Sequence, residues 1–168
     1  MEYSLGMFVP VADRVHVAVA EPEGVNVGLV VGSTGALLVD TGSSPEQGRA
    51  IRAAAEALAG HVPLTHVVVT HAHDDHVGGL AAFDDLVTLG HEHLARACAE
   101  GTPAPSRTFA MASAVNLGDC HVELAHFGRG HTDHDVVAVV PGRKVAFLGD
   151  LLETSAEPSA GTDSWPGE

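Results

Sequence analysis

Cross-linking, aromatic and basic residues are all scarce in this sequence. Two cysteines in 168 residues cannot form a disulfide framework. Aromatic residues make up 4% of the chain, so its core must be built from aliphatic side chains. Lysine and arginine together number 8 against 22 aspartates and glutamates, which leaves a formal net charge of −14 with histidine neutral. Because this charge repels phosphate backbones, the composition argues against nucleic acid as a partner.

The sequence also lacks the features of membrane and exported proteins. No apolar run approaches the roughly 18 residues that span a bilayer. Near the amino-terminus, Glu2 occupies a region where a signal peptide would carry lysine or arginine, and no apolar segment follows. We therefore expect a cytoplasmic protein with no membrane partner, and the sequence leaves its oligomeric state open.

Apolar residues are abundant, at 45% of the chain, which excludes a disordered chain and is enough for one domain with its own core. The pattern Ser44-Pro45-Glu46-Gln47 predicts the capped start of a helix, which Gly60 ends. Strands that alternate with helices predict an α/β layered domain. The strands are expected at 15–19, 26–31, 36–40, 65–70, 86–89, 115–117, 121–124, 136–140 and 145–148, and the helices at 45–59, 77–83 and 91–100.

The domain is expected to cover residues 1–152, because the composition changes after it. Residues 153–168 are rich in serine, glycine, proline and acidic residues, and they contain no further predicted strand or helix. We expect this segment to be a flexible polar tail on a chain that lacks its C-terminal part.

Histidine is the residue in excess, with 12 copies, and three of them cluster directly after a predicted buried strand. Residues 70–76 read Thr-His-Ala-His-Asp-Asp-His. In a loop that leaves a strand, alternate residues such as His71 and His73 project the same way and can share one metal ion. Asp75 and His76, beyond the bend, can face a second ion. Neutral imidazole and carboxylate are ligands that Zn²⁺ prefers, so the segment predicts a metal site.

Two further segments place ligand types at other predicted strand ends. His131 follows a glycine-flanked turn, and Asp150 follows the strand predicted at 145–148. Each is weak evidence alone, but together they provide the additional ligands that a pair of metal ions requires.

Residues 71–76 match the HxHxDH signature, and the chain therefore resembles the metallo-β-lactamase fold superfamily. Companion segments follow in the order of that family: Val-Asp-Thr-Gly at 39–42, Gly-Gly at 78–79, Gly-His-Thr at 130–132 and Gly-Asp-Leu at 149–151. The resemblance covers about residues 25–152, and the full set is far more specific than a single His-x-His pair.

The resemblance implies which residues bind metal. Asp75 and His76 would ligate a second ion, and Asp150 would bridge it to the first. Asp40 would hold the histidine-rich segment by hydrogen bonds, and Thr132 and Asp135 would do similar work. The first ion would be held by His71, His73 and His131.

The fold and chemistry of the superfamily are implied in the same way. The fold is a four-layer αβ/βα sandwich, of which this chain would hold the N-terminal half and part of the second half. The chemistry is hydrolysis by a metal-bound hydroxide on a small-molecule substrate, here a small ester, thioester, lactone or amide, with Asp75 as the catalytic residue that orients the hydroxide. One or two Zn²⁺ ions per chain are expected, with iron or manganese as alternatives.

The sequence departs from the family at the second metal. The family adds a histidine from a later strand, whereas no histidine follows His134. A degenerate metal-binding fragment without catalysis is therefore one alternative. An iron-dependent sulfur dioxygenase is another, because the ligands alone do not distinguish it from a hydrolase. The acidic charge disfavours the nucleases of the superfamily.

Other histidines are expected to lie outside the site. His91 and His93 are two apart in a predicted helix, so they would face different ways into solvent. His134 is expected at the surface beside the His131 segment, and His126 at an ordinary strand or loop position.

Overall fold

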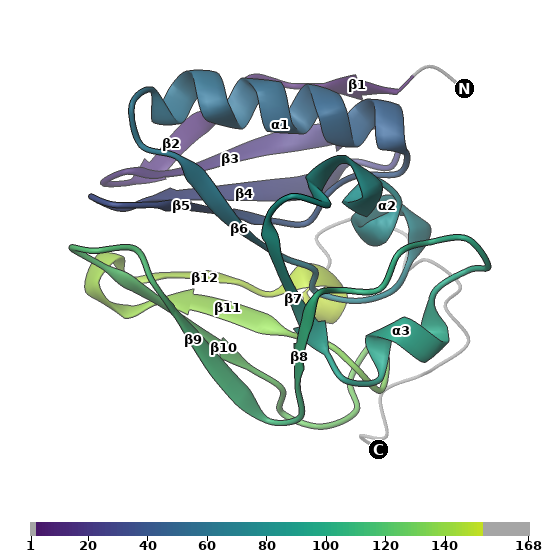
Figure 1. Ribbon diagram of the computed structural model, residues 1–168. Helices are drawn as coiled ribbons and strands as arrows, with labels where there is room; N and C mark the ends of the chain where they lie inside the picture. The colour runs from purple at the N-terminus through teal and green to yellow at the C-terminus, as the bar shows by residue number, and fades with distance from the viewer. Residues whose placement is uncertain (1–2, 153–168) are drawn as a thin grey trace.

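The computed structural model describes residues 3–152, which form two β-sheets and one long helix in stacked layers (Figure 1). The larger sheet has eight strands, paired in the order β1-β3-β4-β5-β6-β7-β8, with β2 also paired to β3. The smaller sheet has four strands in the order β12-β11-β10-β9. The strands are β1 (Ser4–Leu5), β2 (Val9–Ala12), β3 (Val15–Glu21), β4 (Val25–Val31), β5 (Ala36–Val39), β6 (Leu64–Val68), β7 (Val87–His91), β8 (Arg107–Phe109), β9 (Ala112–Asn116), β10 (His121–Ala125), β11 (Val137–Val140) and β12 (Val145–Phe147). The helical segments are α1 (Pro45–Ala59), α2 (Asp74–Val77), η1 (Leu80–Phe83), α3 (Leu94–Ala97), η2 (Pro141–Arg143) and η3 (Gly149–Leu151).

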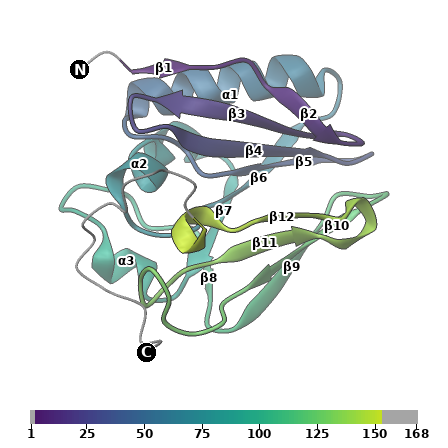
Figure 2. The same cartoon turned by 180° about the vertical axis from the view of Figure 1, so that it is seen from behind.

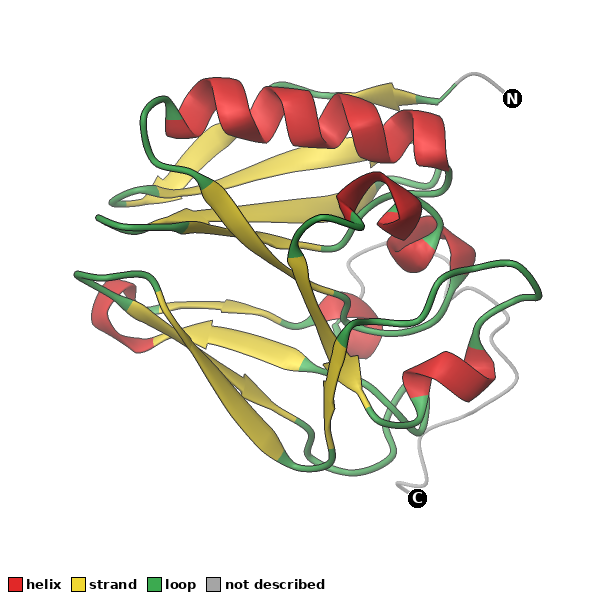
Figure 3. Ribbon diagram, viewed as in Figure 1, coloured by secondary structure: helices red, strands yellow, loops and turns green. Residues whose placement is uncertain are grey.

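The larger sheet has an apolar core on each of its faces. Helix α1 covers one face, and the smaller sheet packs against the other (Figures 1 and 2). Leu38 of β5 belongs to the core beneath α1, while Leu37 and Val39 belong to the core between the sheets. This division follows from the geometry of a strand, in which successive side chains point to opposite faces. The α/β sandwich expected from the sequence is confirmed, and within residues 3–152 no helix covers the outer face of the smaller sheet (Figure 3).

The order of the strands brings several loops to one edge of the molecule. Strands β4 and β5 form an antiparallel hairpin, whereas β5, β6, β7 and β8 run parallel to one another. Parallel strands have their carboxyl ends at the same edge of a sheet, so the loops after β5, β6 and β7 meet there. The short helices α2, α3 and η3 gather at this end in Figure 3.

Helix α1 begins and ends where the sequence predicts. Ser44 caps it by accepting a hydrogen bond from the Gln47 N–H at 3.1 Å, and Gly60 ends it with a φ of 66°. The Gln47 side chain differs from a standard capping box, because its oxygen accepts from the N–H of Ser43 at 2.7 Å rather than from that of Ser44. At 15 residues α1 is the longest helix between residues 3 and 152, where no helix is long and apolar enough to cross a membrane.

Only the middle of the helix predicted at 91–100 is helical. Strand β7 continues to His91, and the Glu92 N–H donates to the Phe109 carbonyl at 2.9 Å, so this segment is held beside β8. Helix α3 therefore spans only Leu94–Ala97. The partner strand, Arg107–Phe109, has three residues and is too short to show an alternating pattern in the sequence.

Other elements differ in extent from the prediction. The helix expected at 77–83 is two segments, α2 and η1, separated by Gly78 and Gly79. Strand β6 ends at Val68, two residues before the predicted end. Strands β1, β2 and β8, of two to four residues each, were not predicted because such short segments show no clear period. The predicted tail at 153–168 lies outside the described residues.

The loop after β5 lies in direct backbone contact with α2 and with the residues that follow α2. The N–H and the hydroxyl of Thr41 both donate to the His76 carbonyl, at 2.8 and 2.7 Å. The Gly79 N–H donates to the Gly42 carbonyl at 2.9 Å. A Cβ at Gly79 would overlap the Thr41 carbonyl oxygen and lie 2.8 Å from the Gly48 Cα. Glycine is therefore required where these two loops and α1 meet.

We expect Gly79→Ala to lower the free energy of unfolding by about 1–3 kcal/mol, because the added methyl group meets backbone atoms that cannot rotate away. Urea unfolding measures the change. Gly142→Ala is the matched control, since a Cβ at Gly142 meets nothing within 4 Å, and its effect is expected within about 0.5 kcal/mol. Equal stability of the two variants would contradict the close approach.

Candidate metal centre

The ligand-type side chains come from three separate strand ends. Residues 69–73, which we call the metal loop, leave the carboxyl end of β6 and carry His71 and His73. His131 lies in the segment between β10 and β11, and Asp150 lies in η3, directly after β12. Figures 1 and 2 both show η3 at the same end of the two sheets as α2. The two sheets therefore bring distant parts of the chain to one place.

Four ligand atoms converge at this point. His73 Nδ1 lies 3.0 Å from His71 Nε2 and 3.0 Å from His131 Nε2. Asp150 Oδ2 lies 3.6 Å from His71 Nε2 and 3.7 Å from His131 Nε2. All four atoms fall within 4.8 Å of one another. The predicted ligands of the first ion and the predicted bridging carboxylate thus form a single cluster.

Asp75 and His76 lie beside this cluster rather than in it. His76 Nε2 is 3.2 Å from Asp150 Oδ1 and 3.7 Å from Asp75 Oδ2. The opposite ring atom, His76 Nδ1, faces Asp40 Oδ2 at 2.8 Å. Asp150 therefore lies between two groups, with its Oδ2 facing the histidine cluster and its Oδ1 facing His76.

Asp40 holds the metal loop, as the sequence predicts. Its Oδ1 accepts from the Thr70 N–H at 2.8 Å, and its Oδ2 accepts from His76 Nδ1. The Thr70 hydroxyl also donates to Asp40 and lies 3.1 Å from His71 Nδ1. Asp40 has a φ of 67°, a left-handed conformation that is unusual for a residue with a side chain. This backbone strain lies directly beside the candidate site, where such strain is typically found.

The pKa shifts of His71, His73 and Asp150 favour the forms that bind a cation, whereas the shift of His76 favours its protonated form while no cation is bound. Burial and then the charge of His76 lower the pKa of His71 to about 2, so its imidazole is neutral at pH 7. Burial and then His131 also lower the pKa of His73. Burial opposes the charging of His76, but interactions with Asp40 and Asp150 outweigh it and raise the pKa of His76 to about 10. Burial likewise acts to raise the pKa of Asp150, but His76 lowers it to about 2.

The arrangement fits a divalent cation. A ring nitrogen carries either one hydrogen or one lone pair, so His73 Nδ1 can make a well-directed hydrogen bond to only one of the two ring nitrogens that it faces. His76 Nε2 is buried, and among the described residues its 3.2 Å contact with Asp150 Oδ1 does not have the geometry of a hydrogen bond. Neutral imidazoles with carboxylates are a donor set that suits Zn²⁺ and other first-row metals. Such an ion would give a partner to the ring nitrogens whose hydrogen bonds cannot all be satisfied at once.

The segment that carries His131 is stabilised by its own hydrogen bonds. Asp135 accepts from the Thr132 N–H at 2.8 Å and from the Thr132 hydroxyl at 2.7 Å. The Gly130 N–H donates to the Thr132 carbonyl at 2.9 Å. The supporting role expected of Thr132 and Asp135 is therefore seen in the turn that presents His131.

The prediction that His134 lies at the surface is wrong. Only 5% of His134 is exposed, and its Nε2 accepts a hydrogen bond from the Ala72 N–H at 3.1 Å. Its Nδ1 lies 2.8 Å from Asp133 Oδ1. Hydrogen bonds from His134 and Arg96, with burial acting the other way, lower the pKa of Asp133 to about 2. Sequence spacing could not reveal this, because Ala72 and His134 are 62 residues apart.

The prediction that His91 and His93 face different ways into solvent is also wrong. His91 is buried at the end of β7, and its ring lies 4.7 Å from the His93 ring and 4.2 Å from the His126 ring, between centroids. Helical spacing does not apply, because β7 extends to His91. Both nitrogens of His91 are engaged, one by the Ala110 carbonyl and one by the His93 N–H. His91 is therefore a core histidine with satisfied hydrogen bonds.

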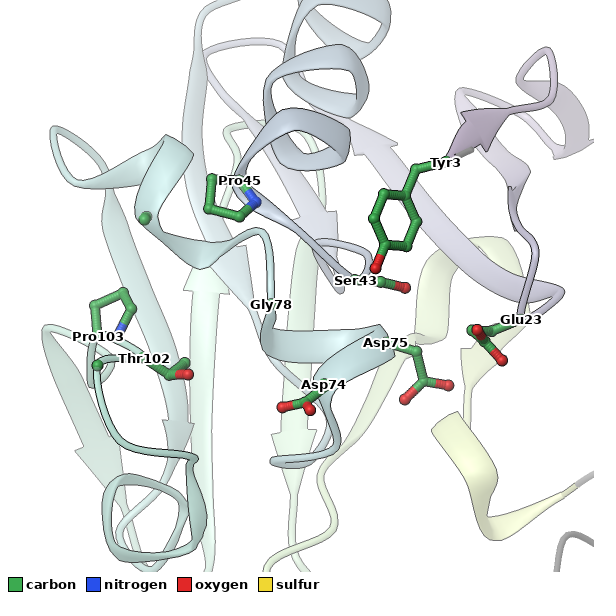
Figure 4. A pocket seen from close by; sticks show the side chains of 11 residues that line it. Tyr3, Glu23, Ser43, Pro45, Asp74, Asp75, Gly78, Thr102 and Pro103 are labelled. Carbon is green, nitrogen blue, oxygen red and sulfur yellow. The ribbon is translucent and has the colours of Figure 1, made fainter. Parts of the chain in front are cut away.

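A pocket of about 480 Å³ opens beside Asp75. Figure 4 shows the end of the Tyr3 side chain beside Ser43, whereas the Asp75 carboxylate points away from both. Its volume is in the range of small-molecule sites. It is lined by Tyr3, Glu23, Ser43, Pro45, Asp74, Asp75, Gly78, Ala81, Gly101, Thr102 and Pro103.

Comparison with known proteins points to one family. The model of the family described as "Metallo-beta-lactamase superfamily" matches residues 20–166. A metallo-beta-lactamase type 2 from Bacillus sp. (strain 170) is 26% identical over 103 residues, which cover 58% of this chain and 39% of the relative. The 2,4-dinitroanisole O-demethylase subunit alpha from Nocardioides sp. (strain JS1661) is 28% identical over 132 residues, which cover 74% of this chain and 40% of the relative. The chain thus spans about 40% of the length of these curated relatives.

A solved structure gives the same indication. The metallo-beta-lactamase from Pontibacter korlensis superposes with a TM-score of 0.70 at 25% identity. The superposition covers 84% of this chain and 68% of that structure.

We expect His71→Ala and His131→Ala each to remove most of the metal that the protein binds, because each deletes one of the four converging ligand atoms. Metal content per chain after reconstitution with Zn²⁺ and desalting measures the loss. His121→Ala is the matched control, since His121 is an exposed histidine that contacts Glu123. Full metal content in either ligand variant would show that the cluster is not the binding site.

Proposed function

Because the chain belongs to the metallo-beta-lactamase superfamily, we propose that it is a metal-dependent hydrolase of a small ester, thioester, lactone or amide. The observation that carries the proposal is the convergence of four ligand atoms, from three strand ends, within 4.8 Å. The chain's −14 charge supports a small-molecule substrate over a nucleic acid.

The proposed ligand sets follow from the distances. His71, His73 and His131 would hold one ion. Asp75 and His76 would hold a second, and Asp150, which lies between the two groups, would contact both. We propose Zn²⁺ as the metal, at one or two ions per chain. Such an ion, when bound, supplies Lewis acidity that polarises the substrate carbonyl and acidifies water.

The chain's own residues would bind the substrate and move the proton. Asp75 lines the 480 Å³ pocket, and its Oδ2 lies 3.7 Å from His76 Nε2, so this residue borders both the proposed substrate space and the second group of ligands. From this position it would orient the attacking water and accept its proton. Asp40, through its bond to His76, keeps that imidazole facing Asp75 and Asp150.

A panel of substrates tests the proposal. The Zn²⁺-loaded protein should hydrolyse at least one of a nitrophenyl ester, a thioester, a lactone and a β-lactam. 2,4-Dinitroanisole belongs in the panel because one relative is named for its O-demethylation. A chelator should abolish turnover, and added Zn²⁺ should restore it. Metal binding without turnover of any compound would contradict the proposal and favour a non-catalytic metal-binding fragment. Bound iron with oxygen consumption would favour a sulfur dioxygenase.

We expect Asp75→Asn to lower kcat by about 10²- to 10⁴-fold, the usual contribution of a positioned acid–base group, while the occupancy of the first metal stays near that of the unchanged protein. The cause is that the amide cannot accept the proton, whereas the three histidines remain. Steady-state kinetics and metal content are measured on the same sample. Asp84→Asn, the same charge change at an exposed residue, is the control. Unchanged kcat in Asp75→Asn would remove Asp75 from the mechanism.

A further inference from the structure

The backbone of the metal loop is held on both sides of His71 by one neighbouring segment. The Val136 N–H donates to the Thr70 carbonyl at 2.8 Å. The Ala72 N–H donates to His134 Nε2 at 3.1 Å. Both contacts come from the residues that follow His131. The segment that presents one predicted ligand therefore also holds the backbone that presents the other two.

The hydrogen bond between Ala72 and His134 is buried, so water cannot easily replace it. Ala72 is 7% exposed and His134 is 5% exposed, so water has little access to this donor and acceptor. Loss of the acceptor would therefore leave a buried backbone N–H unsatisfied, which is unfavourable because water cannot take its place. The peptide of Ala72 lies directly between His71 and His73, so its rotation would move both imidazoles.

The orientation of the His134 ring is set by its second nitrogen. For Nε2 to accept from Ala72, the ring proton must be on Nδ1. His134 Nδ1 lies 2.8 Å from Asp133 Oδ1, and Arg96 donates to Asp133 Oδ2 at 2.9 Å. The His134 N–H is also fixed, by donation to the Thr132 hydroxyl at 3.1 Å. The Asp133 carboxylate thus selects the tautomer that can hold Ala72.

His134 is not placed to bind metal itself. Its Nε2 lone pair is used by the Ala72 N–H, and its Nδ1 faces Asp133. It also lies outside the group of ligand atoms that converge on one point. Its chemistry is therefore that of an acceptor for a backbone donor.

We propose that His134 is a positioning residue: by accepting from the Ala72 N–H it holds the peptide between His71 and His73 so that both imidazoles meet His131. The role rests on the proposed metal function of these three histidines. It predicts that the acceptor at position 134 governs metal affinity, whatever substrate the protein hydrolyses.

Two substitutions of His134 test whether its hydrogen-bond acceptor, rather than the imidazole ring as such, is required. His134→Leu removes the acceptor, and we expect it to weaken Zn²⁺ binding by about 10- to 100-fold, the usual effect of losing a partner that orients metal ligands. His134→Gln offers a side-chain carbonyl to Ala72, and we expect it to recover most of that affinity. Affinity is measured by competition with a chromophoric chelator. The absorption bands of the Co²⁺-substituted protein should change in His134→Leu and remain close to those of the unchanged protein in His134→Gln.

If His134→Leu fails to fold, a substitution at the exposed residue Asp133 still tests the proposal. Asp133 is 47% exposed at its side chain, so Asp133→Ala should fold normally. Without this carboxylate the His134 tautomer is no longer selected, and we expect a smaller loss of Zn²⁺ affinity in the same direction. Thr88→Val is the control for stability alone, because Thr88 in strand β7 is buried and its hydroxyl makes hydrogen bonds to Ser106. It should lower stability without changing Zn²⁺ affinity.

The outcomes distinguish the positioning role of His134 from the proposed hydrolase function. Zn²⁺ affinity and Co²⁺ bands in His134→Leu equal to those of the unchanged protein would overturn the positioning role and leave the proposed function intact. Equal losses in His134→Gln and His134→Leu would also overturn it, because the acceptor would not be the cause. Absence of turnover with any substrate would overturn the proposed function alone, since metal affinity is measured without substrate. Failure of the unchanged protein to bind Zn²⁺ or Co²⁺ would overturn both.

Discussion

The close approach of three imidazole nitrogens is the constraint on which the candidate site depends. His73 Nδ1 lies 3.0 Å from a nitrogen of His71 and 3.0 Å from a nitrogen of His131, with the Asp150 carboxylate beside them. Because a ring nitrogen can make only one well-directed hydrogen bond, these contacts cannot all be satisfied at once, and the rest of the fold must hold the rings together. A cation among them would be bound by their lone pairs, which is why the cluster is best explained as a metal centre.

Contacts to the backbone of the metal loop and to the buried Asp40 carboxylate hold these three histidines in place. Asp40, in a left-handed conformation at the end of β5, accepts from the Thr70 N–H and from His76. On the other side, Val136 and His134 hold the carbonyl of Thr70 and the N–H of Ala72. The metal loop is thus held by residues from both sheets. The buried core on each face of the larger sheet limits the movement of these residues.

Some elements of this fold are determined by local sequence, and others by partners distant in the chain. Helix α1 was predicted to its ends because Ser44 and Gly60 act locally, within one turn of the residues that they cap. The helix at 91–100 was predicted too long because its first residues pair with β8, a partner that the local sequence does not reveal. Short strands such as β1 escaped prediction because two residues show no period. Local signals therefore predicted the long elements, and long-range pairing decided the short ones.

The same division applies to the candidate site. The sequence alone determined the ligand chemistry, because His71, His73, Asp75 and His76 lie in one segment whose residue types and spacing are specific. Only the tertiary structure decided which other residues join them. It brought His131 and Asp150 from separate strand ends into contact, and it buried His134 against Ala72, 62 residues away. The reason is that hydrogen bonds and metal ligands act at distances of a few ångström in space, while a sequence records only neighbours along the chain.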